Sequence, residues 1–504
     1  MKKTLYALLM CSVSVAPALA QTDVEQSILD LIEQKVLPKE VSYETPVSIK
    51  TTAAGYVVNI PQGTLKTDKK TKVPAYVFVL SKEAPFKDAA QYQFTLNSLE
   101  SYSPALKQIL DTQNVRLESF TYQGKIVPSL KLITSQMGQG KNLVFQAGPQ
   151  VDDIIRVGSF LVQDTLDSLS GNLVKAEGDI VLKDVLINHP FLRIAMDQLD
   201  TQISIPQTTL GTTDLDQVLN APEIRLGIDM TGIKAASFFL PVQELRLDSA
   251  FGITLKQDMS TKVVDMNIDW KASNIAAISP ETEFVSKLPT SLIFDMNMKG
   301  FTYADLQSLG QSQNHLNEAR SVPFTRPEAL RVLENEVQTK TNELMAKTSF
   351  FLNNLSLRGN DYAVALRGAV YPQSEAFTGT LTITNFDALS PAPKAIDTQA
   401  CQTATEAWSR ALIQKSGNES DPEVRKASAA ASAACDDGAG FLEFLRPYLA
   451  TAKQVKDEMD KPAVQFAVEY KNGVWYINGK ELGFDTETQN DVSDTTAQKK
   501  PLIP

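Results

Sequence analysis

The stretch Val264-Asp-Met-Asn-Ile-Asp-Trp270 places an apolar side chain at every second position, with Asp or Asn between them. Successive side chains of a β-strand point to opposite faces, so this pattern predicts a strand with one apolar and one polar face. Two nearby stretches repeat it, Ile224-Arg-Leu-Gly-Ile-Asp-Met230 and Leu292-Ile-Phe-Asp-Met-Asn-Met298. The pattern is typical of antiparallel sheet that is covered on one side. The middle of the chain is therefore predicted to be such a sheet.

The same alternation recurs on both sides of this middle region. Val464–Tyr470 alternates again, and Asn472-Gly473 then turns the chain into Val474–Ile477, which is a strong signal for a β-hairpin. The expected fold class is therefore α+β and rich in β, with extended, mostly antiparallel sheets and helical insertions. The other strands expected are Val47–Thr51, Tyr56–Ile60, Tyr76–Leu80, Tyr92–Leu96, Val115–Tyr122, Leu130–Thr134, Val242–Leu247, Phe251–Leu255, Leu355–Arg358, Ala363–Val370 and Gly379–Thr384.

Fewer segments carry the spacing of three to four residues between apolar side chains that indicates a helix. Ser103 ahead of Pro104 is a favourable helix start, because serine caps free N–H groups and proline suits the first turn. Gly138-Gln-Gly140 is interpreted as a turn, since no helix opening with Gly-Lys-Ser/Thr follows it. The helices expected are Val24–Val36, Pro104–Leu110, Val151–Leu169, a longer helix from near Pro327, and Phe441–Met459.

Two cysteines, Cys401 and Cys435, fall in a predicted helical hairpin. Thr398–Lys415 has the spacing of a helix, and a second, alanine-rich helix starts at Ser420-Asp-Pro-Glu423 and runs to about Cys435. An antiparallel hairpin brings the two cysteines opposite one another, so a disulfide is expected that stabilises the chain by roughly 3–4 kcal/mol. The alternative is a redox or nucleophilic cysteine, but neither cysteine has a CxxC spacing or a nearby histidine.

The first twenty residues have the features of a secretory signal. Lys2 and Lys3 precede a short apolar run, and Ala18-Leu-Ala20 is a small-x-small cleavage site. Cleavage after Ala20 and a periplasmic location are therefore expected, and no later segment is apolar for long enough to span a membrane. The expected organisation is a signal peptide at 1–20, a β-rich body at 21–395, a helical insertion with the disulfide at 396–460, a closing hairpin at 461–484 and a disordered tail at 485–504.

The composition removes several classes of function. The 504 residues include two histidines and three cysteines, too few for a histidine-rich metal site or a zinc ribbon. There are 48 Lys+Arg against 59 Asp+Glu, a net charge of −11, without a basic cluster. Nucleic acid is therefore not expected as a partner. No cofactor is expected either, because Rossmann and Walker patterns are absent.

The sequence predicts no catalytic residue. Asp265, Asn267 and Asp269 match the first half of a calcium loop, but Trp270 stands where that loop requires glycine, so a strand is the better interpretation. His189 and His315 are interpreted as a turn and a surface histidine, because no nucleophile motif accompanies them. A pair of acidic residues acting as in glycoside hydrolysis stays open, since a sequence does not show which carboxylates meet across a cleft.

The apolar strand faces are the remaining candidates for a functional site. They are either the inside of a packed core or a groove for an acyl chain, and methionine, being long and adaptable, suits the second. The pattern itself favours the core over the groove. The residues of the candidate ligand face are Met230, Val264, Met266, Ile268, Trp270, Leu292, Phe294, Met296 and Met298.

Several segments resemble the AsmA-like and YdgA-like envelope proteins of Gram-negative bacteria. The pattern is a glycine-led alternating strand that runs into a short turn, as in Gly379-Thr-Leu-Thr-Ile-Thr-Asn-Phe-Asp-Ala-Leu389. Weaker matches start at Gly178 and Met296, and the closing hairpin from Phe466 to Lys480 is similar to the ending of the YdgA-like group. The resemblance implies a long β-rich fold in the periplasm, a role in envelope maintenance and, for the AsmA-like members, lipid movement.

Three hypotheses about function follow. The first is a non-enzymatic periplasmic envelope protein that binds a lipid or another hydrophobic ligand along a sheet-lined groove. The second is a structural module that docks other envelope proteins through its sheet edges or the Cys401–Cys435 hairpin. The third is a periplasmic hydrolase that uses acidic residues. The pattern does not indicate an oligomeric state.

Overall fold

The computed structural model describes residues 24–482 apart from 114, 147–152, 190, 211–220, 238–241, 280–284, 286–287, 323–325, 391–397, 416–421 and 436–441. The expected signal peptide, its cleavage after Ala20 and the expected tail at 485–504 lie outside the described residues. The chain divides into two compact units, Met1–Asn360 and Asp361–Pro504. The division falls ahead of position 395, where the sequence-based outline ended the β-rich body.

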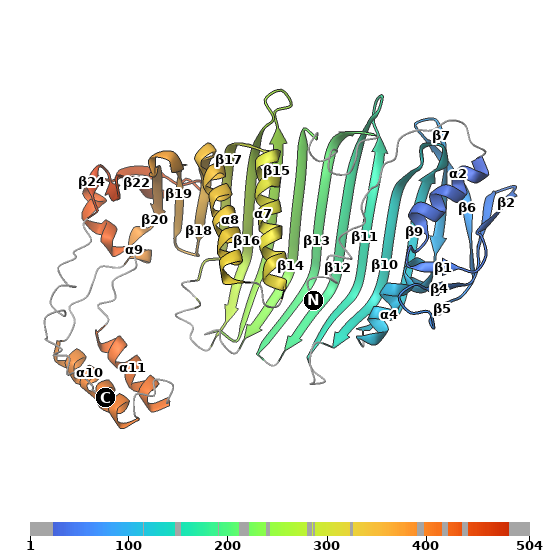
Figure 1. The fold of residues 1–504 in the computed structure, drawn as a ribbon. Coiled ribbons are helices and arrows are strands. Elements are labelled where there is room, and N and C mark those ends of the chain that lie inside the picture. The colour runs from blue at the N-terminus through green and yellow to red at the C-terminus, as the bar shows by residue number, and fades with distance from the viewer. Residues whose placement is uncertain are drawn as a thin grey trace, which may run out of the picture. The chain divides into compact units, whose positions relative to one another are not determined.

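One long antiparallel sheet forms most of the first unit (Figure 1). Its strands neighbour one another almost in chain order, so each joins the next through a hairpin or a short insertion. In the order in which they pair, they are β2 (Ser48–Thr52), β3 (Gly55–Ile60), β6 (Tyr76–Phe86), β7 (Ala89–Leu96), β9 (Ser119–Val127), β10 (Leu132–Gln146), β11 (Ile154–Ser168), β12 (Leu173–His189), β13 (Leu192–Thr209), β14 (Glu223–Ser237), β15 (Glu244–Gln257), β16 (Val263–Ile278), β17 (Ser291–Thr302) and β18 (Ser349–Arg358).

Smaller elements complete the N-terminal end of this unit. A short three-stranded sheet contains β1 (Val41–Tyr43), β4 (Gly63–Leu65) and β5 (Lys72–Val73), and β8 (Val115–Arg116) pairs with the end of β10. The helical elements here are α2 (Val24–Leu31) with a π-helical turn at Ile32–Val36, α3 (Leu99–Tyr102), α4 (Pro104–Thr112) and a 3₁₀ turn at Pro128–Leu130. As expected, the Ser103 hydroxyl caps α4 by accepting a hydrogen bond from the Leu106 N–H.

The main core of the first unit lies where α2 packs on β3, β6, β7 and β9. Alternate residues of these strands, such as Leu80 and Phe94, are fully buried against Ile28 and Ile32. This amphipathic helix is therefore held by tertiary packing, as short helices usually are. A second helical pair, α7 (Tyr303–Ser321) and α8 (Pro327–Lys347), is inserted between β17 and β18.

The strands of the second unit surround a separate core. β22 (Pro462–Lys471) pairs with β20 (Ala376–Thr384) on one side, and with β21 (Lys453–Lys456) and β23 (Val474–Ile477) on the other. Ile383, Leu445 and Phe466 are fully buried in its core. The remaining elements are β19 (Ala363–Tyr371), β24 (Lys480–Glu481), α9 (Phe386–Leu389), α10 (Thr398–Gln414), α11 (Pro422–Cys435) and 3₁₀ turns at Pro372–Ser374 and Glu443–Thr451.

The expected fold class is confirmed. The protein is β-rich with long antiparallel ladders and helical insertions, and a Cys401–Cys435 disulfide joins α10 and α11. The Asn472-Gly473 hairpin between β22 and β23 is also present, with both residues at positive φ. Asp265, Asn267 and Asp269 lie in strand β16, as the alternating pattern predicted.

Three local predictions are wrong. The segment predicted as a helix at Val151–Leu169 contains strand β11, because its residues from Ile154 pair with β10 and β12 along both sides. Gly138-Gln-Gly140 lies inside β10 rather than in a turn, and a Cβ on Gly140 would stand 2.5 Å from the Phe160 ring, so glycine there makes room for a neighbour. The helix predicted at Phe441–Met459 is a 3₁₀ turn with Pro447 inside it, followed by β21.

Candidate functional site: a partly exposed apolar sheet face

The strand register places the apolar residues of β11 to β18 on one face of the sheet. Directly paired residues of antiparallel strands share a face, so the pairs Met266–Met298, Ile268–Met296 and Trp270–Phe294 lie side by side. The row of the last of these pairs continues through all of β11 to β18 and is apolar except at Thr201. One complete row is Val162, Ile180, Thr201, Ile228, Phe251, Trp270, Phe294 and Leu355.

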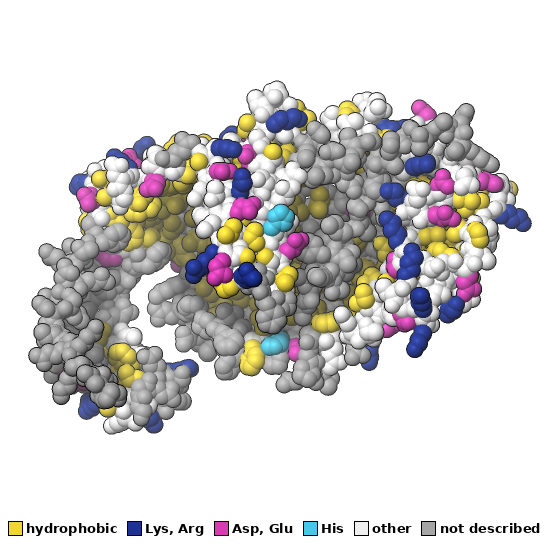
Figure 2. Space-filling view, in the orientation of Figure 1, with side chains coloured by type: hydrophobic (Ala, Val, Ile, Leu, Met, Phe, Trp, Pro, Cys, Tyr) yellow, Lys and Arg dark blue, Asp and Glu magenta, His cyan; other side chains and the backbone are white. Residues whose placement is uncertain are grey.

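This apolar face is only partly withdrawn from solvent. Ile203 is 44% exposed and Trp270 is 37% exposed, and most of their neighbours in the rows are half-buried. The Trp270 indole N–H donates to the Ser249 hydroxyl at 2.9 Å, which fixes the ring on the sheet. Hydrophobic side chains show on and beside the α7–α8 pair in Figure 2. An apolar surface that continues across several strands is the kind of feature that marks a binding site on a protein.

Helices α7 and α8 cover one end of this face. Val264 and Phe301, paired across β16 and β17, form a buried cluster with Tyr303 of α7 and Leu344 of α8. Met266 and Met298, Ile224, Leu255, Leu306 and Leu309 pack around that cluster. The pairs farther along the strands, Ile268–Met296 and Trp270–Phe294, do not belong to it. The helices are therefore anchored to the sheet at one end of the apolar rows.

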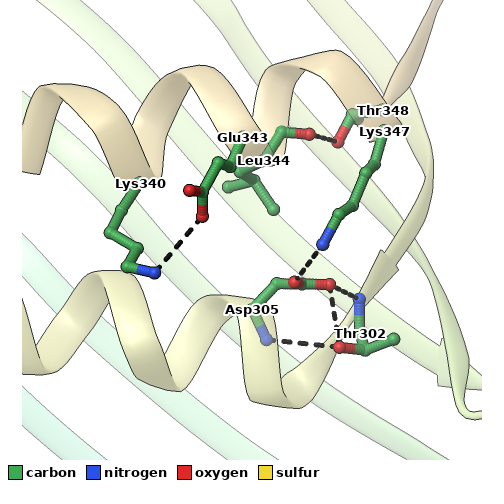
Figure 3. A network of polar contacts seen from close by, with 7 residues as sticks. All are labelled: Thr302, Asp305, Lys340, Glu343, Leu344, Lys347 and Thr348. Carbon is green, nitrogen blue, oxygen red and sulfur yellow. Dashed lines mark hydrogen bonds and ion pairs between the residues drawn. The ribbon is translucent and has the colours of Figure 1, made fainter.

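A polar network joins the start of α7 to the end of α8 (Figure 3). Thr302 and Asp305 form a reciprocal capping box, and Lys347 Nζ lies 2.8 Å from Asp305 Oδ1. Partial burial would raise the pKa of Asp305, but the hydrogen bonds from Lys347 and Thr302 outweigh it and hold the pKa below its usual value. The Thr348 hydroxyl donates to the Leu344 carbonyl at 2.6 Å. These contacts fix the helical pair where it meets the sheet.

The nine predicted ligand-face residues divide into two groups in this arrangement. Val264, Met266 and Met298 belong to the contact between the helices and the sheet, and Val264 is completely buried. Trp270 is exposed, and the other five are half-buried on the same face. These five are Met230, Ile268, Leu292, Phe294 and Met296. The two interpretations of the pattern, core and open face, thus apply to different ends of the same strands.

Aspartates gather on the opposite, polar face of the sheet. Asp200 pairs with Asp229, and Asp269 pairs with Asp295. Partial burial, followed by the charges of Asp179 and Asp229, raises the pKa of Asp200, and burial with Asp295 and Asp229 raises that of Asp269. Among the described residues no group of three or more His, Cys, Asp or Glu side chains has the geometry of a metal site.

One carboxyl, Asp164 of β11, lies on the apolar side of the sheet. It pairs with Gly178, which pairs with Ile203, so all three occupy the same row. A Cβ on Gly178 would stand 2.9 Å from Asp164 Oδ1, which shows that this oxygen overhangs the glycine. Burial, followed by the charge of Asp179, raises the pKa of Asp164 to about 6. Asp164 is not among the predicted site residues, because the pattern of its segment predicts a helix and so hides the face on which it lies.

The raised pKa of Asp164 leads to a prediction about stability. Asp164→Asn is expected to increase the free energy of unfolding by about 1–2 kcal/mol near pH 7.5 and to change it little near pH 4. The folded chain binds more protons than the unfolded one between the ordinary pKa of 3.8 and the raised value of about 6, so stability falls as pH rises through this window. The full difference between the two pKa values corresponds to a free energy of about 3 kcal/mol. The expected effect is smaller because the side chain is only partly buried. Urea unfolding of both proteins at several pH values measures it.

Asp258→Asn is the matched control and has the opposite sign. Asp258 accepts hydrogen bonds from the Ser260 hydroxyl and from the backbone N–H groups of Ser260 and Thr261, which lower its pKa to about 2. Its charged form stabilises the fold above the unfolded pKa, and that contribution is lost as pH falls through the folded pKa. The control variant should therefore be less stable than the parent at neutral pH. Equal stability of Asp164→Asn and the parent near pH 7.5 would contradict the first prediction.

The two histidines lie in different elements, at the end of a strand and in a helix. His189 ends β12 and is exposed, and its Nδ1 accepts a hydrogen bond from the Phe191 N–H at 3.3 Å. His315 is an exposed residue of α7, a helix that the sequence analysis did not predict. His315 is thus the surface histidine that the sequence suggested, whereas His189 lies at the end of a strand rather than in a turn.

Comparison with known proteins assigns no family to the chain. No protein family model, no curated protein and no solved structure matches the chain. In the part of the chain that the structure describes, no helix combines the length and the apolar character needed to cross a membrane.

Proposed function

We propose that the protein binds the acyl chain of a lipid along the apolar face of β11 to β18, as a non-enzymatic protein of the periplasmic envelope. The observation that carries the proposal is the mainly apolar row across these strands, which contains the exposed Trp270, with Ile203 exposed in the neighbouring row of the same face. The resemblance of Gly379–Leu389 to the AsmA-like envelope proteins is consistent with it.

An acyl chain fits the dimensions of the face better than a compact ligand does. Eight neighbouring strands about 4.8 Å apart make a row roughly 34 Å long. The hydrocarbon core of a bilayer is about 30 Å thick and contains two layers of lipid tails, so a single extended tail is about 15 Å long. The row therefore has room for an extended chain. Met230 and Met296 on this face supply adaptable contacts for a chain without fixed shape.

Fluorescence of Trp270 is a direct test of the proposal. In a Trp408→Phe/Trp475→Phe background Trp270 is the remaining tryptophan, since the chain has three. A monoacylglycerol brominated along its chain is expected to quench this fluorescence saturably. Native mass spectrometry with solvent extraction of the purified protein should identify bound lipid.

A pair of double variants separates the face from the rest of the sheet. Ile268→Gln/Met296→Gln, which alters one cross-strand pair of the face, is expected to weaken binding about tenfold or more, because apolar contact area is lost. Val77→Gln/Val79→Gln is the matched control, since these exposed β6 residues alternate with buried Phe78 and Leu80 and so lie on the other face. If the brominated monoacylglycerol left Trp270 fluorescence unchanged in the protein with an intact face, the proposal would be wrong. Extraction of a bound polypeptide in place of lipid would also contradict it.

A further inference from the structure

Phe351 of β18 is an aromatic residue on the polar face of the sheet. It pairs with Asn297 of β17, and the row of this pair crosses β11 to β18 on the face opposite to the one that α7 and α8 cover. The other residues of the row are polar, so packing under the helices does not explain the ring. The complete row is Thr165, Glu177, Ser204, Arg225, Thr254, Asn267, Asn297 and Phe351.

The Phe351 ring lines an open pocket of about 330 Å³ together with Asn297, Lys299 and Asn353. Asn297 and Lys299 lie two positions apart on β17, so their side chains point to the same face as the ring. The register between β17 and β18 shifts at Asn353, which has no partner on β17. Its Nδ2 donates to Asp295 Oδ1 at 3.0 Å and so brings its side chain to the polar face as well. Bulges of this kind are frequent beside binding sites, because they re-aim a side chain.

Three hydrogen-bonding groups surround the ring. Lys299 Nζ lies 3.3 Å from Asp265 Oδ2, and an ammonium with one such partner has further N–H groups to donate. Asn353 uses its Nδ2 toward Asp295, which leaves its Oδ1 as an acceptor. Asn297 Oδ1 is buried and has no partner among the described residues, so its amide nitrogen is the group that it can offer to a ligand.

The charges around the pocket disfavour an anionic ligand. The one ammonium, that of Lys299, already pairs with Asp265. Asp295, which holds Asn353, pairs across the strands with Asp269, and their mutual repulsion contributes to a raised pKa of Asp269. A ligand with its own negative charge would be repelled by these carboxylates, whereas a neutral ligand would not.

We propose that this pocket binds a neutral saccharide, with one sugar ring stacked on Phe351 and its hydroxyls hydrogen-bonded to Asn297, Lys299 and Asn353. A sugar ring has C–H groups on its faces that contact an aromatic ring, and each of its hydroxyls can both donate and accept. The volume is near the lower end of the range of about 300–1,000 Å³ for small-molecule sites, so it suits a short stretch of sugar. The inference is independent of the acyl-chain proposal, because it concerns the other face of the sheet.

Saturation-transfer NMR on the full chain tests the inference with three neutral trisaccharides: maltotriose, cellotriose and tri-N-acetylchitotriose. At least one of them is expected to bind saturably, with the strongest transfer to the C–H protons of one ring face. Trigalacturonate, which carries carboxylates, should bind about tenfold or more weakly than the best neutral ligand.

Variants of the pocket locate the binding. Phe351→Ala should weaken the best trisaccharide about tenfold or more, and Phe351→Tyr should retain binding because it keeps an aromatic ring. Asn353→Ala, at an exposed position, should weaken it as well. Phe350→Ala is the matched control, since Phe350 pairs with Met298 on the other face, and it should leave the dissociation constant little changed. Circular dichroism of each variant distinguishes a lost contact from a lost fold.

Three outcomes overturn the inference. They are the absence of saturable binding by all three neutral trisaccharides, binding that Phe351→Ala and Asn353→Ala leave unchanged, and trigalacturonate binding as tight as that of the neutral ligands. None of them affects the acyl-chain proposal, which is tested at Trp270 on the opposite face.

Discussion

Phe301→Ala is expected to lower the free energy of unfolding of the first unit by about 3–5 kcal/mol. Phe301 and its cross-strand partner Val264 are both completely buried, and they pack against Tyr303 and Leu344 of the helical pair. Truncating the ring leaves a cavity at the point where α7 and α8 meet the sheet, which the fixed strand pairs around it cannot close. Urea unfolding followed by circular dichroism measures the loss.

Phe191→Ala is the matched control for this substitution. Phe191 is 55% exposed, so the same chemical change there should alter stability by about 0.5 kcal/mol or less. The Phe301 variant should also expose the α7–α8 pair to proteolysis before the sheet unfolds, because the cluster is its buried contact with β16 and β17. A Phe301 variant as stable as the Phe191 variant would show that this cluster does not anchor the helices.

The alternation of residues predicted the faces of the strands but not how far the helices cover them. Met266 and Ile268 follow the same pattern in the sequence, yet one packs against the helix cluster and the other does not. The difference arises because α7 starts directly after β17 and so meets the sheet near Phe301. That contact depends on register between strands, which period two does not specify.

Strand β11 was mistaken for a helix because of its length. It spans 15 residues, far more than the usual five or six of a strand, and apolar residues in so long a segment satisfy both periods. The period-two series Phe160, Val162, Asp164 and Leu166 is the signal that identifies both the strand and its acid. A polar residue inside such a series is a candidate functional residue in its own right.

Helix α7 was missed for the opposite reason. Tyr303–Ser321 is polar on most sides and has no apolar stripe to mark it. Its stability comes from the capping box at Thr302 and from contacts with α8, where the Ser312 hydroxyl donates to Glu336 at 2.6 Å and Arg320 pairs with Glu334 at 2.8 Å. The capping residues are visible in the sequence, but the pairing with α8 is tertiary.

Cys401→Ser/Cys435→Ser is expected to unfold the α10–α11 hairpin while the β part of the second unit stays folded. The disulfide closes a loop with a sequence separation of 34, and its removal costs about 3–4 kcal/mol on the chain-entropy model. Packing alone offers little to offset that loss, because α10 has no fully buried side chain and Ile413 is 78% exposed. The sheet keeps a separate core around Phe466.

Hydrogen exchange resolves the two parts of this prediction. In the double variant the amides of 398–414 and 422–435 should exchange rapidly, while those of β20 and β22 should keep the protection of the parent. Treating the parent with a reductant should reproduce the exchange pattern of the variant, because both remove the same cross-link. Cys401→Ala/Cys435→Ala should match the serine variant, which separates the cross-link from the polarity of the new side chains. Full protection of α10 in the double variant would mean that helix packing, despite its exposed side chains, is sufficient to hold the hairpin.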